Sequence, residues 1–273
     1  MLTRIAHATD FSEDGTTAFL HALRLALATR SRLDILHVRA KGQSAGWGHF
    51  PHVREPCVKW GLLGEGSSPD MVETRLGVHV AKVDVTDHDA ASGLSRFFLT
   101  HRPDLLVVAS HARHGVSRWL HGSVSEDLAR RTHVPTLLIQ AGAKGFVDAD
   151  TGHMSLKRVL LPVVASPSPA RAFLLLAGMM ASLGLASGAI DIVTVGESVA
   201  DLMDEAGRPR QVEQLSGNPV DAILEAAQAR MCDIIAMPTI GRHGVLDVFR
   251  GSTTSRVLAG ASCPVLTVPL IAE

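Results

Sequence analysis

An internal repeat constrains the fold of this chain more than any other feature. The word Arg-His-Gly-Val at residues 113–116 returns at residues 242–245, a shift of 129 positions (242 − 113). The same shift carries Asp104-Leu105-Leu106 onto residues 233–235, which read Asp-Ile-Ile. Because one register aligns both a candidate strand and the loop after it, the sequence predicts two copies of a single domain.

The length of 273 residues suits two domains, since roughly 135 residues per copy lies in the common range for one domain. We place the first domain at residues 1–142 and the second at residues 155–273. Residues 143–154 lack an apolar period and are expected to form the linker.

Short apolar runs alternate with helical patterns in both copies. Residues 105–109 are purely aliphatic, as is typical of strands buried on both faces of a parallel sheet. The alternation predicts βαβ units, and so an α/β fold with a parallel sheet in each copy. The predicted strands are residues 4–9, 32–38, 78–85, 105–109 and 135–140, then 158–163, 189–195, 210–215, 233–237 and 264–269.

The first copy carries an insertion. From the first strand to the repeated Gly-Ser word the chain runs 118 positions in the first copy (122 − 4) and 93 in the second (251 − 158), a difference of 25 (118 − 93). The extra residues fall in the loop 41–70, and a loop this long is usually a lid, a binding loop or an interface. Its aromatic residues are too apolar to be left wholly in water, so we expect Trp47, Phe50 and Trp60 to pack over the first cleft or form an intermolecular contact.

Composition excludes several classes of protein. A net charge of −1 indicates no strongly basic surface for nucleic acid, although a local basic patch stays open, and no apolar run approaches the ~20 residues of a membrane span. The three cysteines are far apart and no secretion signal precedes the first strand, which favours reduced thiols and a cytoplasmic location.

Three motifs together resemble the universal stress protein family: Ala-Thr-Asp-Phe-Ser at residues 8–12, Leu-His-Val at 36–38 and Gly-Ser at 122–123. The resemblance covers both copies. It implies a five-stranded parallel sheet flanked by helices in each domain, and pairing of the two domains through their last strands as an intramolecular pseudo-dimer. A homodimer and an unidentified protein partner remain open alternatives.

The resemblance also implies binding of ATP or another adenine nucleotide. Family members use an Asp after strand one, a Val in strand two, and a loop that reads Gly-x-x-Gly, nine residues, then Gly-Ser or Gly-Thr. The first copy keeps the nucleoside side but has Ala109 and Ala112 in place of the leading glycines. The second keeps most of the loop but has Val164 in place of the Asp and Pro238 in place of the first glycine. The predicted binding residues are Asp10, Val38, Gly122, Ser123, Ser125, Gly241, Gly251, Ser252 and Thr254.

Glycines matter in that loop because they reach positive φ and bring backbone N–H groups close to phosphate at a helix start. An isolated phosphate is therefore expected at residues 251–254, and an intact nucleotide in the first copy, where Asp10 can bind ribose. The alternative is that the serines and threonines are only helix caps.

Other chemistries are less favoured. Fourteen histidines are many, and His49, His52 and Cys57 could bind zinc, but their spacing matches no standard zinc module and no metal is expected. No catalytic motif is present, so the chain is expected not to be an enzyme beyond slow, incidental ATP hydrolysis.

The sequence therefore favours a stress-response regulatory or ligand-sensing protein with degenerate nucleotide sites. The first alternative is a nucleotide-independent interaction protein with vestigial clefts. The second is a metal-binding protein that uses the histidine-rich first copy.

Overall fold

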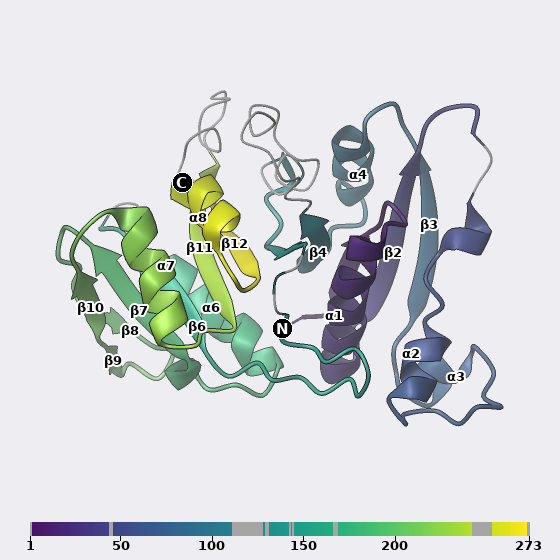
Figure 1. The fold of residues 1–273 in the computed structure, drawn as a ribbon, viewed down its shortest axis with the longest axis horizontal. Coiled ribbons are helices and arrows are strands. Elements are labelled where there is room, and N and C mark those ends of the chain that lie inside the picture. The colour runs from purple at the N-terminus through teal and green to yellow at the C-terminus, as the bar shows by residue number, and fades with distance from the viewer. Residues whose placement is uncertain are drawn as a thin grey trace. The chain divides into compact units, whose positions relative to one another are not determined.

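The computed structural model describes residues 2–43, 46–110, 128, 131–141, 143, 145–165, 169–241 and 253–271 (Figure 1). These residues form two compact units. The N-terminal unit contains the described residues up to Ser155, and the C-terminal unit begins at Leu156. Each unit is described by itself below.

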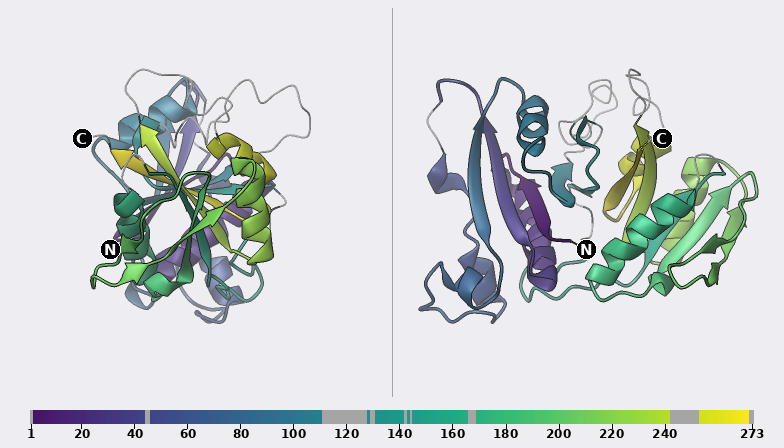
Figure 2. Two further views of the ribbon diagram at one scale, coloured as in Figure 1. Left: turned by 90° about the vertical axis from the view of Figure 1, so that its left-hand side faces the viewer. Right: turned by 180° about the vertical axis from the view of Figure 1, so that it is seen from behind.

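The N-terminal unit is a parallel sheet of five strands, in the order β5-β4-β1-β2-β3. This confirms the predicted fold class. Helix α1 (Glu13–Thr29) and helix α4 (Ala90–Phe98) pack on opposite faces of this sheet, as Figure 2 shows. The strands are β1 (Arg4–Ala8), β2 (Arg32–Arg39), β3 (Val80–Thr86), β4 (Leu105–Ser110) and β5 (Thr136–Gln140).

Local signals explain where α1 begins and ends. Ser12 is its N-cap and accepts a hydrogen bond from the N–H of Gly15 at 3.2 Å, while Glu13 and Asp14 place negative charge in the first turn. The helix ends at Arg30, which adopts the left-handed conformation with φ 53°. The cap fixes the carboxyl end of β1 directly beside the start of the helix.

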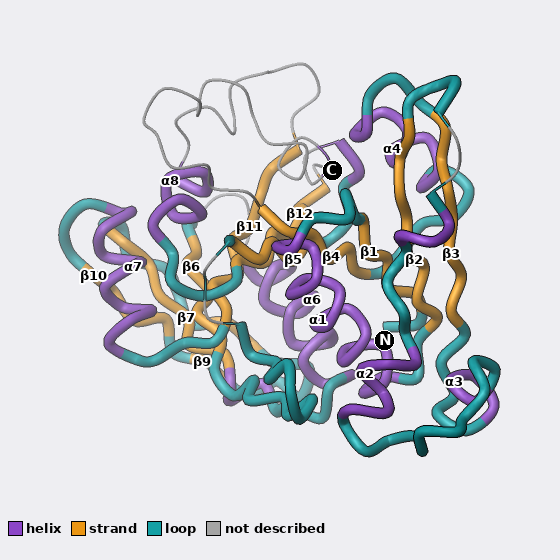
Figure 3. The backbone as a smooth tube through the Cα atoms, turned by 45° about the vertical axis from the view of Figure 1, so that its right-hand side comes forward, coloured by secondary structure: helices purple, strands orange, loops and turns teal. Residues whose placement is uncertain are grey.

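The insertion is more ordered than the sequence predicted. It contains the short helix η1 (Trp47–His49) and helix α2 (Arg54–Lys59), and it is followed by α3 (Met71–Thr74). It leaves the carboxyl end of β2 and reaches the amino end of β3, where α2 and α3 lie (Figure 3). Helices of three to six residues carry too little periodicity to be recognised in a sequence.

The C-terminal unit repeats the five-stranded parallel order as β10-β7-β6-β11-β12. Its strands are β6 (Val159–Val163), β7 (Ile190–Val195), β10 (Val212–Leu215), β11 (Ile234–Gly241) and β12 (Val265–Ile271). Its helices are α6 (Pro169–Ser182), η2 (Ser187–Ala189), α7 (Pro219–Ala229) and α8 (Thr253–Gly260).

One strand prediction in this unit was wrong at its start. The strand expected from Arg210 begins at Val212, because Arg210 belongs to a separate hairpin of β8 (Leu202–Met203) and β9 (Pro209–Arg210). The turn of this hairpin is held by Asp204, whose Oδ1 accepts the N–H groups of Ala206 and Arg208 at 2.9 Å each. In the described residues no helix is long and apolar enough to cross a membrane.

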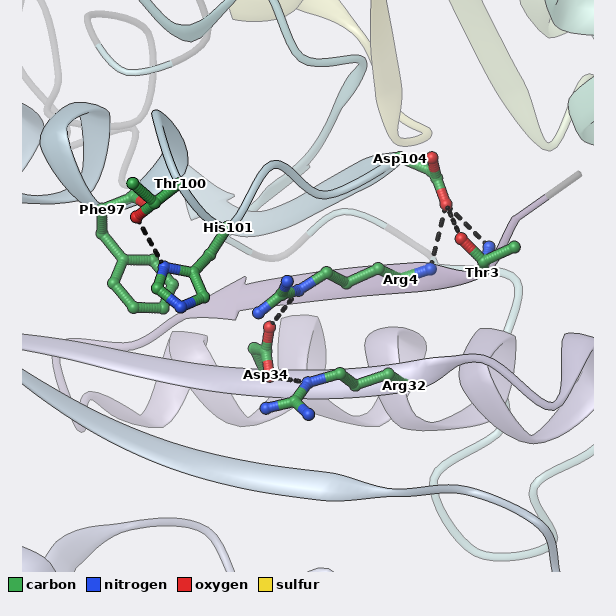
Figure 4. Close-up of polar contacts among 8 residues, drawn as sticks. All are labelled: Thr3, Arg4, Arg32, Asp34, Phe97, Thr100, His101 and Asp104. Carbon is green, nitrogen blue, oxygen red and sulfur yellow. Dashed lines mark hydrogen bonds and ion pairs between the residues drawn. The ribbon is translucent and has the colours of Figure 1, made fainter.

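The amino ends of the strands are closed by a device that both units share. Asp104 Oδ2 accepts the backbone N–H groups of Thr3 at 2.7 Å and Arg4 at 2.9 Å (Figure 4). Asp233 Oδ2 does the same for residues 157 and 158, at 2.8 and 3.0 Å. In the N-terminal unit, Arg4 also pairs with the buried Asp34 at 2.6 Å. These carboxylates accept hydrogen bonds and form ion pairs that hold the strands together at their amino ends. A ligand is therefore expected at the carboxyl ends of the strands.

Candidate functional site

The carboxyl end of β1 holds an ordered acidic turn. Asp10 is exposed, and its Oδ1 accepts the N–H of Ser12 at 3.0 Å and the hydroxyl of Ser12 at 2.6 Å. Thr9 Oγ1 accepts the N–H of Phe11 at 3.0 Å. These bonds fix the Asp10 carboxylate in one orientation at the start of α1, where it can accept hydrogen bonds from a ligand.

Phe11 joins this turn to β2. Its φ of 62° is rare for a residue with a large side chain, and its ring stacks on the imidazole of His37 with the centroids 4.0 Å apart and the planes at 24°. His37 Nδ1 in turn donates to the carbonyl of Thr9 at 2.9 Å. The stacked pair accounts for a backbone conformation that would otherwise be costly.

The insertion places an aromatic cluster over this pair. The Phe50 ring meets Phe11 edge to face, with the centroids 5.3 Å apart, and is 1% exposed. The Trp47 ring stacks on Phe50 at 5.5 Å, and His49 lies 5.8 Å from Phe11. The expectation that Phe50 packs over the first-copy end of the sheet is confirmed. Trp47, by contrast, is 54% exposed.

Val38 lies in the same region but faces away from Asp10. A Cβ built on Gly93 of α4 would be 3.2 Å from Cγ1 of Val38, so the valine side chain packs against that helix. Val38 is at the end of β2, paired with Val85 of β3.

The remaining predicted site residues lie in the second copy or outside the described residues. Gly241 is the last residue of β11 and pairs with Ile271, so the segment from Pro238 to Gly241 is strand where the sequence predicted the start of the loop. Thr254 is in the first turn of α8, and Val164 is 59% exposed at the end of β6. Gly122, Ser123, Ser125, Gly251 and Ser252 lie outside the residues that the structure describes.

Two buried histidines escaped the sequence analysis as functional candidates. Burial lowers the pKa of His7 and that of His21 from 6.5 to about 4 each. His7 Nδ1 donates to the carbonyl of Val107 at 3.0 Å. His21 Nδ1 donates to the carbonyl of Thr17 at 2.8 Å, and its Nε2 accepts from Phe146 and Val147. Both rings are therefore neutral structural groups at pH 7.

The segment expected to be the linker packs against the N-terminal unit. Trp60 Nε1 donates to the carbonyl of Ala149 at 3.2 Å, and Lys59 Nζ lies 2.5 Å from Asp150 Oδ1. A Cβ on Gly152 would lie 2.4 Å from Cδ2 of Trp60. Trp60 thus packs on the linker segment instead of the cleft. The start of the insertion contacts Phe11, and its later part contacts the linker.

No metal centre is formed by the residues that the structure describes, among which no three His, Cys, Asp or Glu side chains converge. Cys57 is buried, and this burial raises the pKa of its thiol to about 11. His52 Nδ1 lies 3.9 Å from Glu55 Oε1 on the surface. The residues weighed for zinc therefore do not form a ligand set with this geometry.

Comparison with known proteins gives one consistent result. The model of the universal stress protein family matches residues 1–140 and 159–269. Universal stress protein MJ0531 of Methanocaldococcus jannaschii is 36% identical over 72 residues, which is 26% of this chain and 42% of that protein. A universal stress protein of Thermus aquaticus is 43% identical over 70 residues, 25% of this chain and 51% of that protein.

These two matches span about half or less of the relatives' own length. A solved structure extends the likeness to the whole chain. The crystal structure of a universal stress protein from Archaeoglobus fulgidus covers 97% of this chain and 96% of its own, with a TM-score of 0.63 and 18% identity. At that identity the likeness is one of fold.

Proposed function

The chain belongs to the universal stress protein family, and from that premise we propose that it is a cytoplasmic regulatory protein that binds an adenine nucleotide at the carboxyl end of β1 and β2. The observation that carries the proposal is the exposed Asp10 carboxylate, held by two hydrogen bonds from Ser12 beside the stacked rings of Phe11 and His37.

The chemistry of this edge fits a nucleoside. Ligands of parallel α/β sheets bind outside the carboxyl ends of the strands. A fixed carboxylate there accepts hydrogen bonds from vicinal hydroxyls such as those of ribose, and it repels a bare phosphate. The phosphates would extend toward residues 122–125, which the sequence assigns to the phosphate loop.

A regulatory role fits better than catalysis. The described residues at this edge include a carboxylate, hydroxyls, aromatic rings and the imidazoles of His37 and His49, and the His37 ring is already stacked on Phe11 and bonded to the carbonyl of Thr9. The two histidines with lowered pKa values are buried in packing roles. Binding without turnover couples a ligand to the shape or partners of the protein.

A second candidate function is nucleotide-independent binding of a protein partner. It is favoured by the C-terminal unit, where the exposed Val164 stands at the end of β6 in the place that Asp10 takes in the N-terminal unit. A valine cannot accept a hydrogen bond from ribose, so one half of the chain lacks the nucleoside acceptor.

Calorimetry with ATP separates the two candidates. Asp10→Asn removes the charge, while the amide oxygen can still accept from Ser12, so the turn is kept. Losing a charged hydrogen bond of about 1.5–3 kcal/mol weakens binding roughly 10- to 150-fold. Asp70→Asn, an exposed position in the same unit, is the matched control and should bind like the parent. Equal affinity of the Asp10 variant and the parent would contradict the site proposed here, and no heat with the parent would favour the partner-binding function.

A further inference from the structure

Trp47 is an exposed aromatic ring with a rigid backing. More than half of its surface is exposed, yet one side of the indole stacks on the ring of Phe50, with the planes at 21°. Phe50 is itself buried against Phe11. A large ring held in this way loses little conformational freedom when a second ring stacks on it.

Hydrogen bonds hold the described chain before and after Trp47. Arg39 at the end of β2 pairs with Asp84 of β3 and donates from Nη1 to the carbonyl of Gln43 at 2.7 Å. After Trp47, the N–H of His49 donates to the carbonyl of Gly46 at 2.9 Å. The exposed indole is thus carried by a segment with defined hydrogen bonds.

A series of ring contacts connects Trp47 to the acidic turn. Its ring touches Phe50, and Phe50 touches Phe11, the residue that follows Asp10. The residue before it, Gly46, would place a Cβ 3.4 Å from Cε2 of Phe11. The exposed ring and the exposed carboxylate are therefore presented from one edge of the unit.

The surroundings of Trp47 fit one planar ring better than a protein surface. Among its described neighbours, Lys41, Gln43, Gly48 and His49 are exposed, and all are polar or glycine. A Cβ added to Gly48 would meet nothing within 4 Å apart from its chain neighbours, so the space beside the residue after Trp47 is open. A single exposed aromatic ring among polar residues is not the contiguous apolar patch that a protein interface uses.

We propose that Trp47 is a stacking platform for the purine base of the nucleotide, a binding role supplied by the insertion. The proposal rests on the proposed function, because the base is that of the ligand whose ribose Asp10 binds. Base stacking on an aromatic side chain tolerates any purine, so the platform adds affinity, and the other contacts of the site set the choice of base.

Calorimetry with two probes tests the platform. Loss of one stacked base corresponds to about 5- to 150-fold weaker binding. Trp47→Ala should weaken ATP by this factor and leave inorganic tripolyphosphate unchanged. Trp47→Phe, which keeps a smaller ring, should lie between. Trp60→Phe is the matched control, because that ring packs on the linker instead, and it should bind ATP like the parent.

Fluorescence gives an independent readout, since a stacked purine quenches indole emission. ATP should quench the parent, and the quenching should be lost in Trp47→Phe and kept in Trp60→Phe. The proposal is overturned if Trp47→Ala binds ATP like the parent, or if it loses ATP and tripolyphosphate equally.

The failure of the platform is distinct from failure of the site. If Asp10→Asn weakens ATP and Trp47→Ala does not, only the stacking is wrong. If the parent binds no ATP, both proposals fall. A shift in oligomer size in Trp47→Ala with ATP affinity unchanged would mark the ring as an interface and contradict the platform.

Discussion

The imidazole Nε2 of His21 accepts a hydrogen bond from the backbone N–H of Phe146 at 3.0 Å, across 125 positions of sequence. The same nitrogen lies 3.2 Å from the backbone nitrogen of Val147. The Phe146 ring meets the imidazole edge to face with centroids 4.7 Å apart. One neutral histidine in α1 thus anchors the start of the linker segment.

This arrangement predicts acid sensitivity. The pKa of His21 and that of His7 are lowered to about 4 in the folded state and are near 6.5 when unfolded. The unfolded state therefore binds more protons between these values, so stability is complete above about pH 6.5 and falls as the pH drops toward 4. Each histidine contributes up to about 3 kcal/mol over this window. Denaturant unfolding at pH 7.5, 6, 5 and 4 measures the effect as the change in the free energy of unfolding with pH.

His21→Leu is the variant that isolates one contribution. It should be less stable than the parent at pH 7.5, since two N–H groups lose their acceptor at about 1–3 kcal/mol. It should also lose less stability on acidification. A parent whose free energy of unfolding is unchanged from pH 7.5 to 4 would contradict this assignment.

The contact between Trp60 and Gly152 predicts a steric effect. Gly152 has φ 66°, and a Cβ there would lie 2.4 Å from the indole. Gly152→Ala should cost about 1–2 kcal/mol for the left-handed backbone and a further 1–3 kcal/mol for the overlap. Gly207→Ala, with φ 71° and nothing within 4 Å, should show the backbone cost alone. Equal losses of thermal stability in the two variants would mean that the indole of Trp60 does not constrain the linker at Gly152.

The two shared acidic residues predict matching effects in the two units. Asp104→Ala and Asp233→Ala each remove the acceptor of two backbone N–H groups, and each should lower stability by about 1–3 kcal/mol. Burial acts to raise the pKa of Asp104, but hydrogen bonds from Thr3 and Arg4 hold that pKa below its ordinary value. Hydrogen exchange should locate each loss in the unit that carries the substitution, and a loss spread evenly over the chain would argue against it.

Pairing of the two domains through their last strands stays a prediction. Both β5 and β12 end the strand order of their own unit and follow a proline, and two edges that cover one another avoid aggregation. All amides of both strands should then exchange as slowly as those of β4. Fast exchange at alternate residues of β5, on the side away from β4, would show an open edge.

The fold followed from the sequence because its signals are local and repeated. Aliphatic strands such as Leu105–Ser110 alternate with capped helices in both copies, which predicts the parallel order. The β8–β9 hairpin could not be predicted, because its turn depends on the side chain of Asp204 and its strands have two residues each. The role of His21 depends on partners 125 positions away, and no local pattern carries that information.

The site was predicted only in part. The motif around Asp10 predicted a site at the carboxyl end of β1, which stays a prediction, and the apolar character of Phe50 predicted its burial. The same reasoning did not place the other two rings: Trp47 stacks on Phe50 and stays 54% exposed, while Trp60 packs on the linker segment. Apolarity says that an aromatic ring will seek contacts, while the tertiary structure decides which ones.

The most direct test of nucleotide binding is to denature the purified protein, identify any released nucleotide by mass, and titrate the emptied and refolded protein with ATP. We predict release of an adenine nucleotide at up to about one per chain, because only the N-terminal unit has the carboxylate at the end of its first strand, and measurable heat on titration. Absence of adenine nucleotide from the released material together with no heat on addition of ATP would contradict the account.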